Sequence, residues 1–156
     1  MTINILFVCL GNLCRSPMAE FLMREKIKQA GLQDFIKTSS AGTSGWHEGG
    51  DMHCGTAEIL DQHKIESTGF QSKKVRSENW QFYDYIIAMD ETNLQDLERL
   101  FGHHPEKLFK ITELCPNLGY HDIPDPWYTK DFNLTYQLLD PCCDALLNKI
   151  RTTYSL

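Results

Sequence analysis

The fold is decided by the stretch Ile3-Asn4-Ile5-Leu6-Phe7-Val8-Cys9-Leu10-Gly11-Asn12-Leu13-Cys14-Arg15-Ser16-Pro17-Met18-Ala19-Glu20. Its first half is an apolar run, which is typical of a strand buried on both faces within a parallel sheet. Ser16-Pro17 is typical of a helix cap followed by proline at the first helical position. The stretch therefore predicts a strand, a short loop and a helix.

The loop of this stretch runs from Cys9 to Arg15. A short loop that leads into a helix turns several backbone N–H groups inward and forms a site for an anion. A thiol at the floor of such a site ionises readily, and an arginine at its rim binds two oxygens of a tetrahedral anion. Cys and Arg at this spacing form a weak motif alone, but the strand, Gly11-Asn12, Ser16-Pro17 and the helix supply the context that the chemistry needs. The pattern indicates a cysteine nucleophile directed at phosphate.

The run from Val8 to Pro17 closely resembles the phosphate loop of the low-molecular-weight protein tyrosine phosphatases. The resemblance continues through Ser40-Ala41-Gly42-Thr43-Ser44-Gly45-Trp46, Ala88-Met89-Asp90-Glu91-Thr92-Asn93-Leu94 and Asp125-Pro126-Trp127-Tyr128, in the family's order and across almost the whole chain. It implies a single α/β domain over residues 1–156, with a four-stranded parallel sheet, helices on both faces and a phosphate-binding loop after the first strand. The implied activity is hydrolysis of phosphotyrosine in proteins, without metal or other cofactor.

A chain of 156 residues suits one domain with a single core. The net charge of −6 argues against nucleic-acid partners and against binding to an anionic membrane surface. No apolar stretch reaches the roughly 18 residues of a membrane helix, and no secretory signal is recognisable. The six cysteines show no disulfide or metal-site spacing, and His103-His104 is expected in a solvated loop. We therefore expect reduced thiols, a cytoplasmic location, and a monomer or weak dimer.

Strands alternate with helices along the chain, which predicts right-handed crossovers and a parallel sheet. After the first strand, strands are expected at residues 35–42, nearer the sheet edge, and at 85–89 and 107–111. Helices are expected at residues 17–30, 57–62, 94–101 and from about 134, with a disturbance near Pro141. Residues 42–50 and 114–133 are expected to be irregular, and 66–79 to be a loop or short helix with a solvated basic run. Ligands bind at the carboxyl ends of such strands, where Cys9, the loop after Gly42 and Asp90 meet.

Phosphoryl transfer from a tyrosyl ester needs a nucleophile, a charge clamp and a proton for the leaving oxygen. Cys9 is expected to be the nucleophile and Arg15 the clamp. Ser16 has two open roles, since its hydroxyl could cap the helix or donate a hydrogen bond to the Cys9 thiolate. Asp125 lies between two prolines, where it could be a turn residue, but the resemblance implies that it is the general acid. Asp90 is expected to cap its helix rather than to take part in the chemistry.

The resemblance assigns supporting roles to further residues. The loop residues Leu10, Gly11, Asn12, Leu13, Cys14 and Ser16 are expected to bind phosphate or shape the loop, and Ser40 to brace it through Asn12. In the family this brace includes a histidine, but Phe70 stands at the matching position here and cannot form the hydrogen bond. Aromatic walls around the substrate ring are expected from Trp46, Trp127 and Tyr128. The resemblance also implies a reversible Cys9–Cys14 disulfide under oxidation.

Other activities share this loop and need to be weighed. Thiol-dependent arsenate reduction relays a disulfide through further cysteines before the Met89-Asp90 block, but residues 55 to 114 contain no cysteine. Arginine-phosphate phosphatases usually carry threonine at the position of Leu13, so leucine favours phosphotyrosine. A phosphotyrosine-binding module without turnover would be expected to lack Cys9 or Asp125, and both are present.

Overall fold

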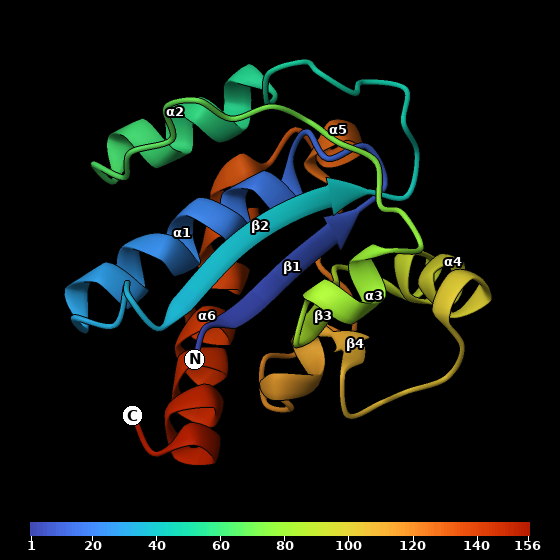
Figure 1. The fold of residues 1–156 in the computed structure, drawn as a ribbon. Coiled ribbons are helices and arrows are strands. Elements are labelled where there is room, and N and C mark those ends of the chain that lie inside the picture. The colour runs from blue at the N-terminus through green and yellow to red at the C-terminus, as the bar shows by residue number, and fades with distance from the viewer.

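A four-stranded parallel sheet lies at the centre of the computed structural model, which describes residues 1–156 (Figure 1). Its strands are β1 (Ile3–Cys9), β2 (Ile36–Gly42), β3 (Tyr85–Ala88) and β4 (Leu108–Lys110), in the order β2-β1-β3-β4. Phe7 of β1 pairs with Ser40 on one side and Ile87 on the other. The predicted sheet and the edge position of the second strand are confirmed, with the bounds of β2, β3 and β4 within one residue of those expected.

Helices cover both faces of this sheet (Figure 1). They are α1 (Arg15–Gln29), α2 (Cys54–Gln62), α3 (Asn79–Phe82), α4 (Glu91–Phe101), the 3-10 helix η1 (Ile111–Leu114), α5 (Pro126–Thr129) and α6 (Phe132–Tyr154). On one face α1 packs against α6 with α2 beside them, and on the other face α4 packs against β3 and β4. No helix combines the length and the apolar character that crossing a membrane requires.

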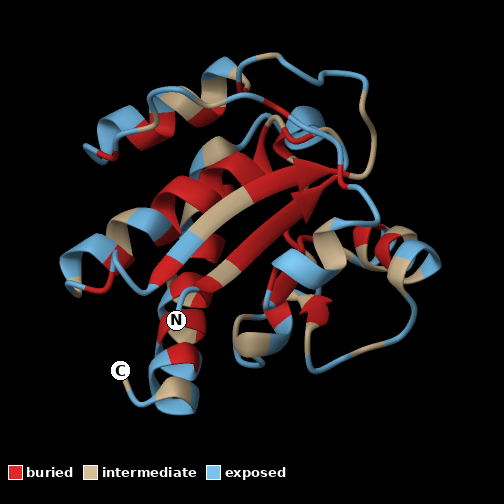
Figure 2. Ribbon diagram, in the orientation of Figure 1, coloured by how far each residue is buried: buried red, intermediate tan, exposed pale blue.

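The first strand is buried between these two layers, as its apolar run predicts. Ile5 and Phe7 contribute to a cluster of 29 buried residues with α1 and α6, whereas Leu6 and Val8 point into a cluster of nine on the α4 side. Most of the buried apolar area that stabilises the fold therefore lies between the sheet and α1 and α6. Figure 2 shows β1 buried along most of its length and the edge strand β2 partly exposed. The burial holds the end of β1, and with it Cys9, in a fixed place.

The junction between β1 and α1 differs from the prediction in one respect. The helix begins at Arg15, so Ser16 is the second helical residue and Pro17 the third. Cys14 occupies the cap position and makes no side-chain capping hydrogen bond. The assignment of Ser16 as the cap was therefore wrong, because its hydroxyl lies 3.0 Å from the Cys9 sulfur instead. Proline is tolerated at its position because N–H groups of the first turn have no helical partner.

Other helix bounds differ by a few residues. α2 starts at Cys54, before the expected residue 57, because the His53 ring accepts a hydrogen bond from the Gly55 N–H as its cap. The segment that was expected to be irregular contains the single turn of α5. α6 runs through Pro141 without a break. Proline has no N–H to donate, so one helical hydrogen bond is missing at Pro141, but the helix continues and residues on both sides of it, Leu138 and Cys142, are buried in the core.

Candidate active site

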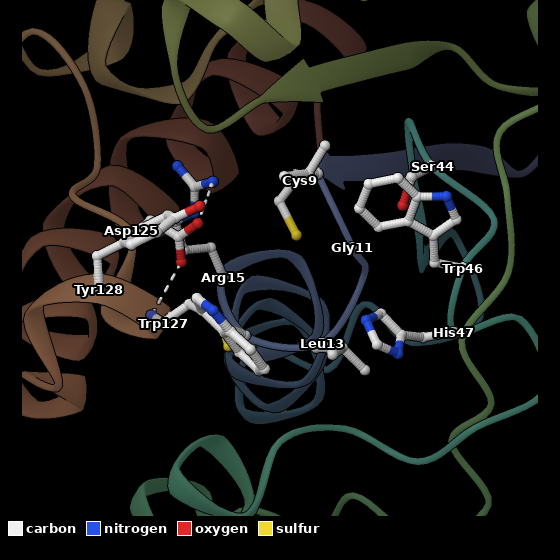
Figure 3. Close-up of a pocket in the computed structure, with 12 residues that line it drawn as sticks. Cys9, Gly11, Leu13, Arg15, Ser44, Trp46, His47, Asp125, Trp127 and Tyr128 are labelled. Carbon is white, nitrogen blue, oxygen red and sulfur yellow. Dashed lines mark hydrogen bonds and ion pairs between the residues drawn. The ribbon is translucent and has the colours of Figure 1, made fainter.

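The loop between β1 and α1 presents a row of unpaired backbone donors. None of the N–H groups of residues 10 to 16 donates a hydrogen bond to another protein atom. In Figure 3 the loop passes from Cys9 through Gly11 and Leu13 to Arg15 and curves around the Cys9 sulfur. A concave set of free N–H groups at the start of a helix attracts an anion, because these groups and the helix dipole carry partial positive charge. The loop thus has the form of an oxyanion site with a thiol at its floor.

The curvature of this loop depends on Asn12. Its φ of 54° lies in the left-handed region, which asparagine tolerates better than most residues. The side chain is fully buried, and Nδ2 donates to Ser16 Oγ and to Ser40 Oγ, each at 2.9 Å. Its Oδ1 accepts from the Lys73 backbone N–H at 2.9 Å. These three bonds offset the strain of the backbone and connect the loop to β2, as the predicted brace through Ser40 requires.

Phe70, in contrast, lies outside this network. Its ring packs edge-on against Phe21 with the centroids 6.0 Å apart. The hydrogen bond expected to be missing at this position is indeed absent, and Ser40 instead donates to the Glu20 carboxylate at 2.6 Å. The brace is therefore complete, but it is built from a carboxylate and a backbone N–H that the sequence pattern did not indicate.

Cys9 ends β1 and is 3% exposed. Its sulfur is within 3.0 Å of Ser16 Oγ, at the first turn of α1. The second thiol of the loop, Cys14, lines the same cavity. Burial, together with Cys9 and Asp125, raises the pKa of Cys14 to about 12. Cys14 is therefore a neutral thiol at physiological pH, and only Cys9 has the position of a reactive sulfur.

Arg15 begins α1 and is almost completely buried. Its Nη1 donates to Asp90 Oδ2 at 2.6 Å and to the Ile123 carbonyl at 2.9 Å, and Nη2 lies 3.4 Å from Asp125 Oδ2. Burial opposes the charge of the guanidinium, but Cys9 and Asp90 outweigh it and raise the pKa of Arg15. The buried Nε donates to nothing, so the side chain keeps a free donor for an anion.

Asp90 and Asp125 come from separate loops and meet at Arg15. Asp90 caps α4 as predicted, with Oδ1 accepting from the Asn93 N–H at 2.7 Å, and its other oxygen binds Arg15. Asp125 caps α5 through Trp127 N–H, at 3.0 Å from Oδ1. Its Oδ2 is free of the capping bond and faces Arg15. Asp125 is thus both a turn residue and a carboxyl group at the cavity.

The cavity above Cys9 has a volume of about 170 Å³. Trp46 and His47 lie on one side of Cys9 in Figure 3, and Trp127 and Tyr128 lie on the other. Its lining residues are Cys9, Leu10, Gly11, Leu13, Cys14, Arg15, Ser44, Trp46, His47, Asp125, Trp127 and Tyr128. The structure brings together every predicted residue of the cavity, while Asn12, Ser16 and Ser40 lie behind the loop. A planar aromatic group fits between such walls with its anionic end at the loop.

Residues 4–155 match the family described as low molecular weight phosphotyrosine protein phosphatase. The chain belongs to this family. Low molecular weight protein-tyrosine-phosphatase PtpA of Staphylococcus aureus is 39% identical over 148 residues, which are 95% of this chain and 94% of that protein. YfkJ of Bacillus subtilis, a low molecular weight protein-tyrosine-phosphatase, is 39% identical over 150 residues, 96% of each chain.

The crystal structure of YfkJ superposes with a TM-score of 0.94, at 38% identity, and covers 98% of this chain and 97% of its own. The crystal structure of DARP, a Drosophila arginine phosphatase, superposes with a TM-score of 0.86, at 27% identity, and covers 96% of this chain and 98% of its own. The low molecular weight phosphatase fold therefore occurs in proteins whose names specify different phosphorylated residues.

Several residues around this phosphatase loop were missed by sequence reasoning. The sequence placed Asp90 at this end of the sheet as a helix cap but gave no sign of its second role, which is to accept a hydrogen bond from Arg15. Thr56 donates to the Cys14 carbonyl at 3.0 Å. Lys73, assigned to a solvated basic run, contributes its backbone N–H to Asn12. Glu20 had no signal, because an acidic residue on a helix is ordinarily exposed.

Proposed function

We propose that this phosphatase hydrolyses phosphotyrosine in proteins through a phosphocysteine intermediate on Cys9, without a metal ion. The observation that carries the proposal is the set of unpaired N–H groups of residues 10 to 16 around the Cys9 sulfur. These groups and Arg15 can hold the nonbridging oxygens of a phosphoryl group directly above the sulfur. Membership of the low molecular weight phosphotyrosine protein phosphatase family supports the same activity.

In the first step the Cys9 thiolate attacks phosphorus and the bond from phosphorus to the tyrosyl oxygen breaks. Asp125 gives its proton to the leaving oxygen, so tyrosine departs neutral. Arg15 stays bonded to Asp90 through Nη1, and its remaining donors follow the charge that develops on the phosphoryl oxygens. Asp125 Oδ2 lies 3.4 Å from Arg15 Nη2 on the same side of the cavity, so the acid can reach the leaving oxygen while the clamp holds the phosphoryl oxygens.

In the second step water attacks the phosphocysteine and the phosphorus–sulfur bond breaks. The Asp125 carboxylate accepts the proton of that water, which regenerates the acid and releases inorganic phosphate. The sulfur leaves as a thiolate next to Ser16 Oγ, 3.0 Å away. Because Asn12 already donates to Ser16, the Ser16 hydroxyl can donate its own hydrogen to the sulfur, which lies nearer at 3.0 Å than the Ala41 carbonyl at 3.4 Å. Of the two roles that the sequence left open for Ser16, this geometry supports the second.

Two alternatives within the same fold are disfavoured. Arsenate reduction needs a cysteine relay, but the cavity contains no thiol besides Cys9 and Cys14. Hydrolysis of arginine phosphate is the closer rival, since an arginine phosphatase shares this fold. Leu13 adds an apolar side chain to the aromatic lining of the cavity, which suits a phenyl ring better than a guanidinium group. Phosphotyrosine is therefore the substrate class that we propose.

The partners that we propose are proteins carrying phosphotyrosine, not nucleic acids or membranes. We also propose that the enzyme acts in the cytoplasm as a monomer or weak dimer. All six cysteines are free thiols, which suits a reducing compartment. Size-exclusion chromatography with light scattering tests the oligomeric state.

Phosphate release from phosphotyrosine, phosphoarginine and a simple aryl phosphate tests the proposed function, with thiol-dependent arsenate reduction measured beside it. The Cys9→Ser variant should lose turnover and still bind phosphate, because a serine hydroxyl stays protonated at neutral pH. Trapping during aryl phosphate turnover should place the phosphoryl group on Cys9. Undiminished turnover in Cys9→Ser, or a trapped phosphoryl group on Cys14, contradicts the proposal.

A further inference from the structure

Glu20 is a buried carboxylate that no step of the proposed reaction uses. It lies one turn into α1, is 7% exposed, and lines none of the cavity above Cys9. Burial raises its pKa, although Ser40, Arg24 and Lys73 act in the opposite direction. Burying a carboxylate is unfavourable unless its oxygens are hydrogen-bonded. The hydrogen-bond partners of Glu20 therefore indicate what this carboxylate does.

Both carboxylate oxygens of Glu20 have a partner, and the two partners differ. Oε2 accepts from Arg24 Nη2 at 2.7 Å, in an ion pair whose arginine side chain is half exposed. Oε1 accepts from the buried Ser40 hydroxyl at 2.6 Å. The other charged group near this carboxylate is Lys73, whose ammonium donates to Ser39 Oγ. The phosphatase loop is therefore connected to a partly exposed ion pair through one serine.

The hydrogen bonds from Lys73 through Asn12 to the two serines and Glu20 have only one consistent direction. The Lys73 N–H donates to Asn12 Oδ1, so Asn12 Nδ2 must face the two serines and give one hydrogen to each. Ser40 receives one of these hydrogens and passes its own to Glu20. Ser16 receives the other, and its own hydrogen has two acceptors within reach, the Cys9 sulfur at 3.0 Å and the Ala41 carbonyl at 3.4 Å, of which the sulfur is the nearer. An ionised carboxylate only accepts, so Glu20 fixes the direction at the end opposite to Cys9.

We propose that Glu20 is a positioning residue that acts through Ser40 and Asn12 to aim the Ser16 hydroxyl at the Cys9 sulfur. Without the carboxylate, the Ser40 hydroxyl has no acceptor at this position and turns its hydrogen toward Asn12, which withdraws one of the bonds that hold the amide. Asn12 then binds Ser16 less firmly, and the thiolate loses a preorganised donor. The inference rests on the proposed role of Cys9 as the nucleophile.

The Glu20→Met variant removes the acceptor and keeps most of the side-chain volume. Glu25→Met is the matched control, because Glu25 lies on the same helix and is bonded only to Gln29 on the surface. The first measurement is the rate of iodoacetate alkylation of Cys9 against pH, read from the Cys9 peptide by mass spectrometry. In Glu20→Met the curve should move to higher pH, since a thiolate that loses a hydrogen bond is less stable. In Glu25→Met it should coincide with the wild type.

The second measurement is single-turnover hydrolysis of the phosphocysteine, which should slow about ten-fold in Glu20→Met, the effect of losing one hydrogen bond to a charged leaving group. Ser40→Ala should reproduce both changes while leaving the Glu20–Arg24 pair in place. The double variant Glu20→Met/Ser40→Ala should be no worse than either single variant. Losses that multiply in the double variant contradict action through Ser40 and overturn the proposal.

Urea unfolding shows whether Glu20→Met folds. If it does not, Ser40→Ala decides the question, and an alkylation curve and hydrolysis rate equal to those of the wild type overturn the proposal. The proposal is also overturned if Glu20→Met folds and gives the same alkylation curve and the same hydrolysis rate as Glu25→Met. Alkylation needs no phosphatase activity, so a wild type inactive on every phosphate ester would refute the proposed function without deciding the role of Glu20.

Discussion

Asp125 has two roles, as a helix cap and as the proposed general acid, and one substitution separates them. Its Oδ1 accepts the capping hydrogen bond from Trp127 N–H, whereas Oδ2 faces the cavity 3.4 Å from Arg15 Nη2. Asp125→Asn keeps an oxygen for the cap, and asparagine is as good a cap as aspartate. It cannot supply a proton. The variant therefore removes the proposed acid and leaves the turn intact.

The expected magnitudes differ by enough to be told apart. A positioned general acid contributes about 10² to 10⁴-fold in rate, which corresponds to roughly 3 to 5 kcal/mol of the barrier. Loss of the long contact with Arg15 changes the stability by about 1 kcal/mol or less, because Arg15 keeps Asp90 at 2.6 Å and the Ile123 carbonyl at 2.9 Å. Asp125→Ala loses the cap as well, which costs about 1 kcal/mol of stability.

Single-turnover phosphorylation of Cys9 by a series of aryl phosphates is the assay. A tyrosyl oxygen leaves poorly as phenolate, because the conjugate acid has a pKa of about 10. Asp125→Asn should therefore slow most on phosphotyrosine and much less on esters with acidic leaving groups, and the basic limb of its pH profile should flatten. If the loss is the same for every leaving group, Asp125 only shapes the loop, and Asp122 is the next residue to test as the acid.

Three further predictions concern the loop and the buried thiol and phenol groups. Arg15→Lys should lower kcat/KM by roughly 10²-fold or more, because an ammonium cannot bind two oxygens side by side, and near-normal turnover would exclude the clamp. Peroxide should inactivate the wild type reversibly through a Cys9–Cys14 disulfide, whereas Cys14→Ser should not recover in dithiothreitol; equal recovery would contradict the link. Burial raises the pKa of Cys14, Cys142 and Tyr85 to about 12, so their neutral forms favour the fold. Their contribution to the free energy of unfolding should be complete below about pH 9 and should be lost as the pH rises toward 12. Urea unfolding across this range measures that loss, and a flat profile would refute the prediction.

The sequence was sufficient for the sheet, because the apolar run of β1 identifies a strand buried on both faces and the glycine-containing loop after it identifies the anion site. It also placed Cys9, the loop after Gly42 and Asp90 together, since the carboxyl ends of parallel strands meet, and the resemblance supplied Asp125 and the aromatic walls. Ser44 and His47, which also line the cavity, were not predicted. It left the role of Ser16 open, because capping and binding a nearby sulfur demand the same hydroxyl, and only the geometry distinguishes them.

The bonds behind the loop were beyond sequence reasoning for a different reason. Arg15 and Asp90 are 75 positions apart, and Glu20 and Ser40 are 20 apart on different elements. No local periodicity records such pairs. The contribution of Lys73 is a backbone N–H, which every residue except proline carries, so its identity as lysine gave a misleading signal.

The unpaired N–H groups of residues 10 to 16 also concern the stability of the folded chain. They concentrate partial positive charge that a bound anion relieves, and the unfolded chain has no such arrangement. By thermodynamic linkage, an anion that binds only the folded state stabilises it by about 2.7 kcal/mol at a concentration one hundred times its Kd. Inorganic phosphate, the product of the proposed reaction, is such an anion. The product that blocks the site therefore also protects the fold, so resistance to unfolding and proteolysis would follow the phosphate supply of the surrounding solution.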